Sequence, residues 1–94
     1  MSDAVSPPAE LTLLYREGCH LCDEMEGLLA ELLPATSYRL HRLDIDDDAA
    51  LRAAHDHRVP VLLLEERELC HHFLDLQTVR DALAGYTRTD RSDA

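Results

Sequence analysis

The chain has 94 residues, of which 46% are hydrophobic and 30% are charged, the balance of one small globular domain. A chain of this length buries roughly 60–65% of the surface of its unfolded form, enough for one core and not for two. Its 19 acidic residues oppose 9 basic ones, all of them arginine, so the formal net charge is −10. The electrostatic field of this negative charge repels nucleic acid and anionic lipid, so we expect neither as a partner.

Both ends of the chain are polar and show no apolar period. The predicted organisation is a flexible N-terminal tail over 1–9, one domain over 10–86 and a flexible C-terminal tail over 87–94. The sequence has no secretion signal and no run of roughly 18 apolar residues that would span a bilayer. We therefore expect a cytoplasmic, monomeric protein, whose cysteines are reactive thiols, metal ligands or core residues rather than structural disulfides.

The first half of the chain alternates strand and helix patterns. The apolar run Leu11–Tyr15 predicts a buried strand. Residues 22–33 carry apolar side chains at helical spacing until Pro34 ends the pattern. A second strand is predicted over 38–45, and the acidic run Asp46–Asp48 offers an N-cap and a negative first turn for a short helix.

In the second half, a polar loop leads to Val59-Pro60 and to the continuous apolar run Val61–Leu64, which is typical of a central strand. Residues 68–73 follow a turn and can pair back as a hairpin strand, and Asp75 caps a final helix. The order β-α-β-α-β-β-α predicts an α/β domain with a four-stranded mixed sheet flanked by three helices.

The chemistry of the sequence lies in Cys19-x-x-Cys22, between the first predicted strand and the first predicted helix. A nucleophilic cysteine reacts as the thiolate, and a helix N-terminus lowers the pKa of a thiol through its unpaired N–H groups and positive dipole end. Arg16 and His20 place further positive charge nearby, whereas Glu17 and the acidic first turn of the helix act against it. We expect a lowered pKa at Cys19. Because Cys22 follows one helical turn later, it can reach back to close a disulfide.

These residues resemble the glutaredoxin-like branch of the thioredoxin fold, in element order and spacing over about residues 10–86. The resemblance implies a thioredoxin-like fold and thiol–disulfide oxidoreductase activity. It implies that the peptide bond before Pro60 is cis and that Pro60 faces the cysteine pair. It also implies that the backbone of Val59 contacts a bound thiol peptide, and that Arg16 neutralises the thiolate or a glutathione carboxylate. The residues that carry it are Leu13-Leu14-Tyr15-Arg16-Glu17-Gly18-Cys19-His20-Leu21-Cys22-Asp23, and Val59-Pro60 before an apolar strand.

The sequence departs from this family at two positions that concern the substrate. Typical glutaredoxins carry a Gly-Gly step about ten residues after the cis proline, where backbone amides receive the glutathione carboxylate; Cys70-His71 stands there. The middle pair of the cysteine motif is His20-Leu21, and the chain has no tryptophan. Glutathione binding is therefore left open.

We expect no bound cofactor, a disulfide-containing protein or a small thiol as the substrate, and glutathione or a reductase as the electron donor. The predicted catalytic residues are Cys19 and Cys22, and the predicted substrate-binding residues are Arg16, His20, Val59 and Pro60.

Two alternatives stay open: a non-catalytic thiol- or metal-binding module, and a partner-specific adaptor on the same fold. Cys70 and one residue of the pair His71-His72 could complete a zinc site with the two motif cysteines, but the usual zinc signature repeats a close-spaced pair. We therefore expect no metal. Cys70 itself is expected to be a buried strand residue on the side of the fold near Cys19.

Overall fold

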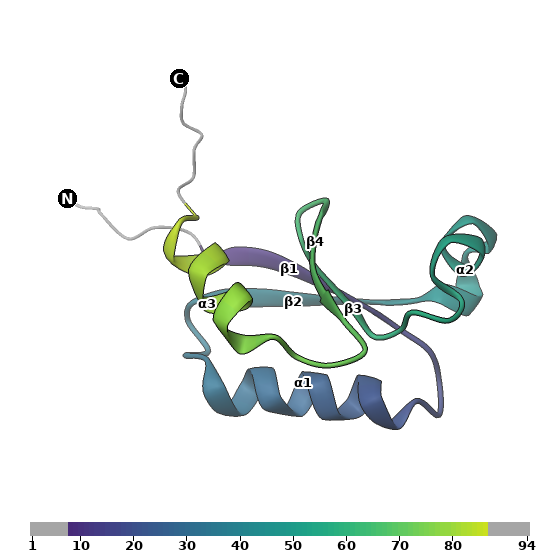
Figure 1. The fold of residues 1–94 in the computed structure, drawn as a ribbon, viewed down its shortest axis with the longest axis horizontal. Helices are drawn as coiled ribbons and strands as arrows, with labels where there is room; N and C mark the ends of the chain where they lie inside the picture. The colour runs from purple at the N-terminus through teal and green to yellow at the C-terminus, as the bar shows by residue number, and fades with distance from the viewer. Residues whose placement is uncertain (1–7, 87–94) are drawn as a thin grey trace, which may run out of the picture.

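The computed structural model describes residues 8–86; of the predicted tails, residues 1–7 and 87–94 lie outside the described residues. None of the helices in the described part has the length and apolar character that crossing a bilayer requires. The elements, drawn in Figure 1, are β1 (Ala9–Tyr15), α1 (His20–Leu32), β2 (Tyr38–Asp44), the 3-10 turn η1 (Ile45–Asp47), α2 (Ala49–His55), β3 (Val61–Leu64), β4 (Arg67–His71) and α3 (Leu76–Ala84).

The strands form one mixed sheet in the order β2-β1-β3-β4. Strand β1 pairs in parallel with β2 and antiparallel with β3, which pairs antiparallel with β4. The predicted four-stranded sheet with three helices is therefore confirmed. Strand β1 begins at Ala9, two residues before the predicted strand, because the N–H of Ala9 bonds the carbonyl of Ser37 and its side chain is buried.

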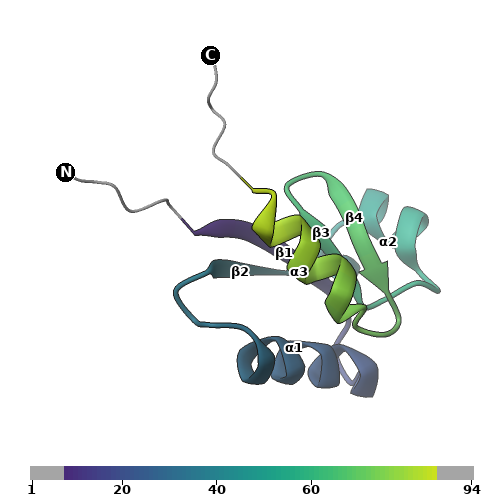
Figure 2. The same ribbon diagram turned by 60° about the vertical axis from the view of Figure 1, so that its left-hand side comes forward.

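The core is divided between the two faces of the sheet, and β1 contributes to both. Leu13 packs with Met25 of α1 and Val79 of α3, which cover one face. Its neighbour Leu14 points to the other face and packs with Ile45. This is why β1 is apolar at consecutive positions rather than alternating. Figures 1 and 2 show α1 and α3 against the sheet, with α2 at the end of the molecule where β1 and β2 finish.

The structure corrects the predicted second strand and the predicted acidic cap of α2. Strand β2 ends at Asp44, and Ile45 turns into η1 to reach full burial in the second core cluster. The carboxylate of Asp44 accepts from the N–H of Asp46 at 2.9 Å and caps η1. Asp48 alone caps α2, accepting from two N–H groups of its first turn at 2.9 and 3.1 Å. The acidic run therefore belongs to two successive turns.

The last strand contains a bulge, and it runs over Arg67–His71 rather than the predicted residues 68–73. The pairing of β3 with β4 shifts between Leu62 and Leu63, so Leu69 is an extra residue that interrupts the strand alternation. Leu69 and Cys70 consequently both contact the core on the side of α1 and α3. Cys70 is half-buried rather than buried, and the strand ends at His71.

Candidate active site

The backbone before α1 places Cys19 at the helix N-cap. Gly18 adopts φ +76°, a left-handed conformation that favours glycine, and turns the chain after Glu17. Cys19 follows with extended dihedrals, and its carbonyl accepts the helical hydrogen bond from the N–H of Asp23 at 3.2 Å. The N-cap is the position at which a side-chain acceptor reaches the free amide groups of the first turn. In most helices an oxygen fills this role, and here a sulfur does.

The two cysteine sulfurs of the motif are joined in a disulfide, with the Cα atoms 5.2 Å apart. The Sγ of Cys19 accepts a hydrogen bond from the N–H of Cys22 at 3.1 Å. The two residues differ in access, because Cys19 is partly exposed whereas Cys22 is 2% exposed. An incoming sulfur can therefore approach Cys19, and Cys22 is covered.

The Cys22 N–H that bonds the Cys19 sulfur is one of the unpaired amide groups of the α1 N-terminus. When the disulfide is reduced, the same N–H can donate to Cys19 either as a thiol or as a thiolate. It bonds the negative thiolate more strongly than the neutral thiol. The helix dipole acts in the same direction. His20 follows at the first helical position, with an exposed side chain beside the cysteine pair.

The segment around Pro60 enters the sheet beside the end of β1. The Val59–Pro60 peptide bond is cis, as the resemblance implied, and Pro60 is buried. The antiparallel register pairs Leu14 with Val61, so Pro60 stands next to the strand end from which the chain runs on to Cys19. The predicted contacts of Val59 and Pro60 with a substrate stay predictions.

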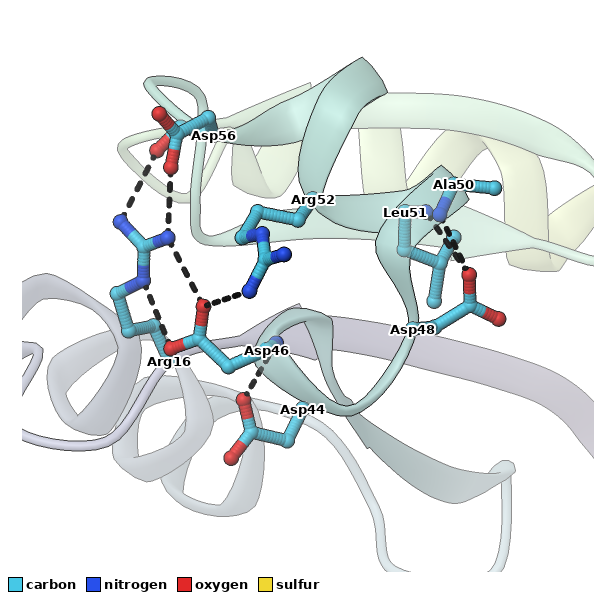
Figure 3. A network of polar contacts seen from close by, with 8 residues as sticks. All are labelled: Arg16, Asp44, Asp46, Asp48, Ala50, Leu51, Arg52 and Asp56. Atoms are coloured by element: carbon cyan, nitrogen blue, oxygen red, sulfur yellow. Dashed lines mark hydrogen bonds and ion pairs between the residues drawn. The ribbon is translucent and has the colours of Figure 1, made fainter.

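Arg16, predicted at the thiolate or at a glutathione carboxylate, lies in a network with two carboxylates (Figure 3). Its Nε and one terminal nitrogen donate to the two Asp46 oxygens at 3.1 and 3.0 Å. It also donates to the Asp56 carboxylate at 2.6 Å and to the Asp56 carbonyl at 3.4 Å. Hydrogen bonds from this guanidinium hold the pKa of Asp46 and the pKa of Asp56 below the usual range of a carboxyl group. The predicted role of Arg16 at the thiol stays a prediction. Within residues 8–86, its side chain bonds the segments that contain Asp46 and Asp56.

His72, which the sequence marked only as a possible zinc ligand, reaches the cis-proline segment from the end of β4. Its backbone has φ +67°, and the hydrogen bond from the N–H of Phe73 to the carbonyl of His71, at 2.7 Å, closes a three-residue γ-turn around it. The N–H of His72 donates to the Pro60 carbonyl at 2.8 Å. Its ring Nε2 bonds the carbonyl of His57 at 2.7 Å.

The left-handed backbone at His72 lies one residue beyond the predicted position of the Gly-Gly step. Cys70 and His71, which stand at the predicted position of that step, both lie in β4. The positive φ that glycine favours falls one residue later, at His72. Left-handed conformation is uncommon for a non-glycine residue, so nothing in the sequence indicated it. The following side chain, Phe73, is 67% exposed.

Cys70 lies outside the disulfide and borders a cleft. Burial raises the pKa of its thiol. The cleft has a volume of about 600 Å³, and its lining includes Cys70, Phe73 and Asp75. Within residues 8–86 no group of three or more His, Cys, Asp or Glu side chains is placed to hold a metal ion. The cysteine and histidine side chains that a zinc site would require are therefore not brought together in the described structure.

The fold and the position of the cysteine pair define a class: a thioredoxin-like domain with a Cys-x-x-Cys disulfide at the N-terminus of its first helix. The family model described as Glutaredoxin-like domain (DUF836) matches residues 10–84. The chain belongs to this glutaredoxin-like family. An uncharacterised protein of Mycobacterium tuberculosis is 32% identical over 83 residues, which cover 83% of this chain and 86% of that protein. A protein of Mycobacterium bovis, also uncharacterised, matches with the same identity and coverage.

Solved structures agree with this assignment. The solution structure of a Nitrosomonas europaea protein has 38% identity and a TM-score of 0.73, covering 86% of this chain and 96% of that one. The crystal structure of an X. campestris protein has 40% identity and a TM-score of 0.64, with coverage of 81% and 97%. A thioredoxin from Halobacterium salinarum, at 24% identity, has a TM-score of 0.56 over 87% of this chain and 77% of its own, and shares the fold.

Proposed function

We propose that this protein is a thiol–disulfide oxidoreductase whose redox centre is the Cys19–Cys22 pair. The observation that carries the proposal is the asymmetry of the pair at the start of α1. The partly exposed Cys19 sulfur accepts the N–H of Cys22, whereas the second sulfur is covered. An accessible sulfur at a helix N-terminus is the arrangement that favours a reactive thiolate. The coverage of the other sulfur suits a thiol that acts only within the protein.

The reaction begins with the reduced pair. The Cys19 thiolate attacks one sulfur of a substrate disulfide, forms a mixed disulfide and expels the other substrate sulfur, which takes up a proton. Cys22 then loses its proton and attacks the Cys19 sulfur, which releases the second substrate thiol and leaves the Cys19–Cys22 bridge. The substrate gains two electrons and two protons: the protein supplies both electrons and the Cys22 proton, and the solvent returns the proton that Cys19 released on ionising.

A second exchange restores the dithiol. Two molecules of glutathione, or a dithiol reductase, supply two electrons and two protons and leave as the corresponding disulfide. In this proposal His20 adjusts charge beside the pair, the backbone of Val59 borders the docked substrate, and Pro60 shapes the docking groove. The substrate is a disulfide-containing protein or a small thiol in its disulfide form. The protein works as a monomer in the cytoplasm, whose reducing systems regenerate it.

Three serine variants test the assignment of roles, with reduction of a disulfide-bonded fluorescent peptide as the assay. Cys19→Ser is expected to reduce the rate to background, because it removes the attacking sulfur. Cys22→Ser is expected to accumulate a mixed disulfide with the peptide on Cys19, visible by mass spectrometry. Cys70→Ser, the matched control, is expected to retain the wild-type rate.

Full activity in Cys19→Ser would contradict the assignment of the nucleophile. If the wild-type protein turns over no disulfide while Cys22→Ser captures one partner covalently, the protein is an adaptor and not an oxidoreductase.

A further inference from the structure

We propose that Arg16 is a positioning residue that holds the cis-proline segment, residues 56–60, beside Cys19, and that it does not act as an anion-binding residue at the thiol. The inference rests on the proposed thiol–disulfide exchange and concerns how a peptide substrate is presented to the same site. Arg16 stands three residues before Cys19, so it belongs to the loop that leads into the cysteine pair.

The guanidinium bridges two loops that are far apart in sequence. One side bonds both oxygens of Asp46 in η1, and the other bonds the side chain and the carbonyl of Asp56 (Figure 3). Asp56 closes α2 as its C-cap and precedes Pro60 by four residues. This arrangement uses the planar, multi-donor shape of arginine, which the single ammonium of a lysine does not reproduce.

The opposite side of the same segment is held from β4 and the turn that follows it. Arg58 pairs with Glu68. The N–H of His72 donates to the Pro60 carbonyl, and the His72 ring bonds the His57 carbonyl. The segment is therefore fixed from two sides, and Arg16 is its link to the cysteine loop. A docked chain must place its sulfur in line with Cys19, and small displacements of a reacting atom lower exchange rates steeply.

The charge of Arg16 is compensated by its partners. Each of its two carboxylates accepts from it at 3.1 Å or less. Arg52 adds a second cation, 4.0 Å from Asp46. The two arginines and the two carboxylates together carry no net charge. A cluster of zero net charge offers little attraction to a thiolate or to an anionic substrate.

The test separates position from charge by comparing two substrates and one titration. Asp56→Asn removes the ion pair between Arg16 and the segment. Arg16→Lys keeps the positive charge but removes the planar guanidinium that bonds both aspartates. Both are expected to lower kcat/KM for a disulfide-bonded peptide by about 5- to 30-fold. The same variants should change kcat/KM for the small neutral disulfide bis(2-hydroxyethyl) disulfide by less than about twofold, because it needs no docked chain. The ultraviolet titration of the Cys19 thiolate should coincide with that of the wild type.

Two further variants are the controls. Glu26→Gln breaks a comparable pair, to Arg42 at 3.0 Å, and changes the net charge by the same amount as Asp56→Asn. It should leave all three readouts unchanged. Asp56→Glu keeps the carboxylate and should retain most of the peptide activity, and the activity of Asp56→Asn toward the small disulfide shows that its loss on the peptide does not reflect misfolding.

The opposite results overturn the proposal. If Arg16 acted by charge, Arg16→Lys would keep its activity and Asp56→Asn would shift the thiolate titration to lower pH. Wild-type values for both substrates in Asp56→Asn would also refute the positioning role while leaving the proposed function intact. A wild-type protein that exchanges with neither disulfide would refute the proposed function itself.

Discussion

Among single residues, Gly18 and Cys19 have the most direct effect on the geometry of the site. Gly18 takes the left-handed conformation, and Cys19 then presents its sulfur to the N–H of Cys22. A Cβ added at Gly18 would meet no atom of the described residues within 4 Å. The requirement for glycine is therefore a matter of backbone conformation and not of space.

We expect Gly18→Ala to lower the free energy of unfolding by about 1–2 kcal/mol, the cost of a left-handed non-glycine residue. Gly27→Ala is the matched control. Gly27 lies inside α1, and a Cβ there also meets no described atom within 4 Å. Alanine at that position should stabilise the protein by about 0.5–1 kcal/mol. Urea denaturation of the oxidised protein measures both, and a neutral or stabilising Gly18→Ala would contradict the account.

The residues of the site were predictable to the extent that they form a local motif. Cys19 and Cys22 are three apart, and their spacing with the following helical pattern located the redox pair. The partners of Arg16 were not predictable, because Asp46 and Asp56 lie 30 and 40 residues away and look like ordinary solvated acids. His72 was missed because its role depends on a backbone conformation that histidine seldom adopts.

At the scale of the elements, the helix caps determine where the helices begin. Asp75 is the N-cap of α3, which covers the sheet face that also contains Cys70. Its carboxylate accepts from the N–H of Thr78 at 3.1 Å and from the Thr78 hydroxyl at 2.9 Å. The N–H of Thr78 lowers the pKa of this carboxyl group.

Asp75→Ala is expected to reduce the free energy of unfolding by about 1 kcal/mol, because it leaves the first-turn N–H of Thr78 without its acceptor. Asp81→Ala in the same helix removes, among the side-chain hydrogen bonds of residues 8–86, the contact with Gln77 at 2.9 Å. Its expected cost is smaller, about 0.2–0.5 kcal/mol. Thermal and urea denaturation of the two variants measure the difference, and equal costs would show that the cap contributes nothing beyond a surface pair.

Periodicity predicted the long elements and failed where the chain departs from regular geometry. The apolar run of β3 and the helical spacing of α1 were sufficient to place them, because each buries a continuous stripe. The sequence predicts strand at Ile45, the first residue of the turn η1, because Ile45 is buried in either conformation. The bulge at Leu69 has no sequence signature. Cys70, which follows it, is half-buried, whereas the sequence predicted a buried residue.

Across the whole molecule, several of the 19 acidic residues accept hydrogen bonds from other parts of the fold. Hydrogen bonds from Arg16 lower the pKa of Asp46 and of Asp56, and the N–H of Thr78 lowers that of Asp75. Burial would raise the pKa of Glu68, but hydrogen bonds from Arg58 and His71 outweigh it and the net direction is down. The folded protein therefore holds these four groups ionised to lower pH than the unfolded chain does.

The sign of the pH dependence follows. As the pH falls, the unfolded chain binds protons first, near the ordinary values of 3.8 for aspartate and 4.5 for glutamate. The stability that these groups contribute is complete above that range and is lost as the pH falls through their lower folded values. We expect the urea midpoint to be level down to about pH 5 and to fall below about pH 4, in roughly 0.2 M salt to screen the net charge.

The double variant Asp46→Asn with Asp56→Asn is the control for this dependence. It lacks the two carboxylates bound to Arg16, so its urea midpoint should change less between the same pH values. A wild-type midpoint that rises steadily with acidification would show instead that relief of the −10 charge dominates.

The central claim is that Cys19 and Cys22 form a reversible two-electron redox centre, and equilibration against a graded series of reduced and oxidised glutathione tests it most directly. Alkylation followed by mass spectrometry would count the free thiols at each step. We predict one cooperative transition between a Cys19–Cys22 disulfide and its dithiol, with Cys70 alkylated at every step. No transition across the series, or a bridge formed through Cys70, would contradict the account.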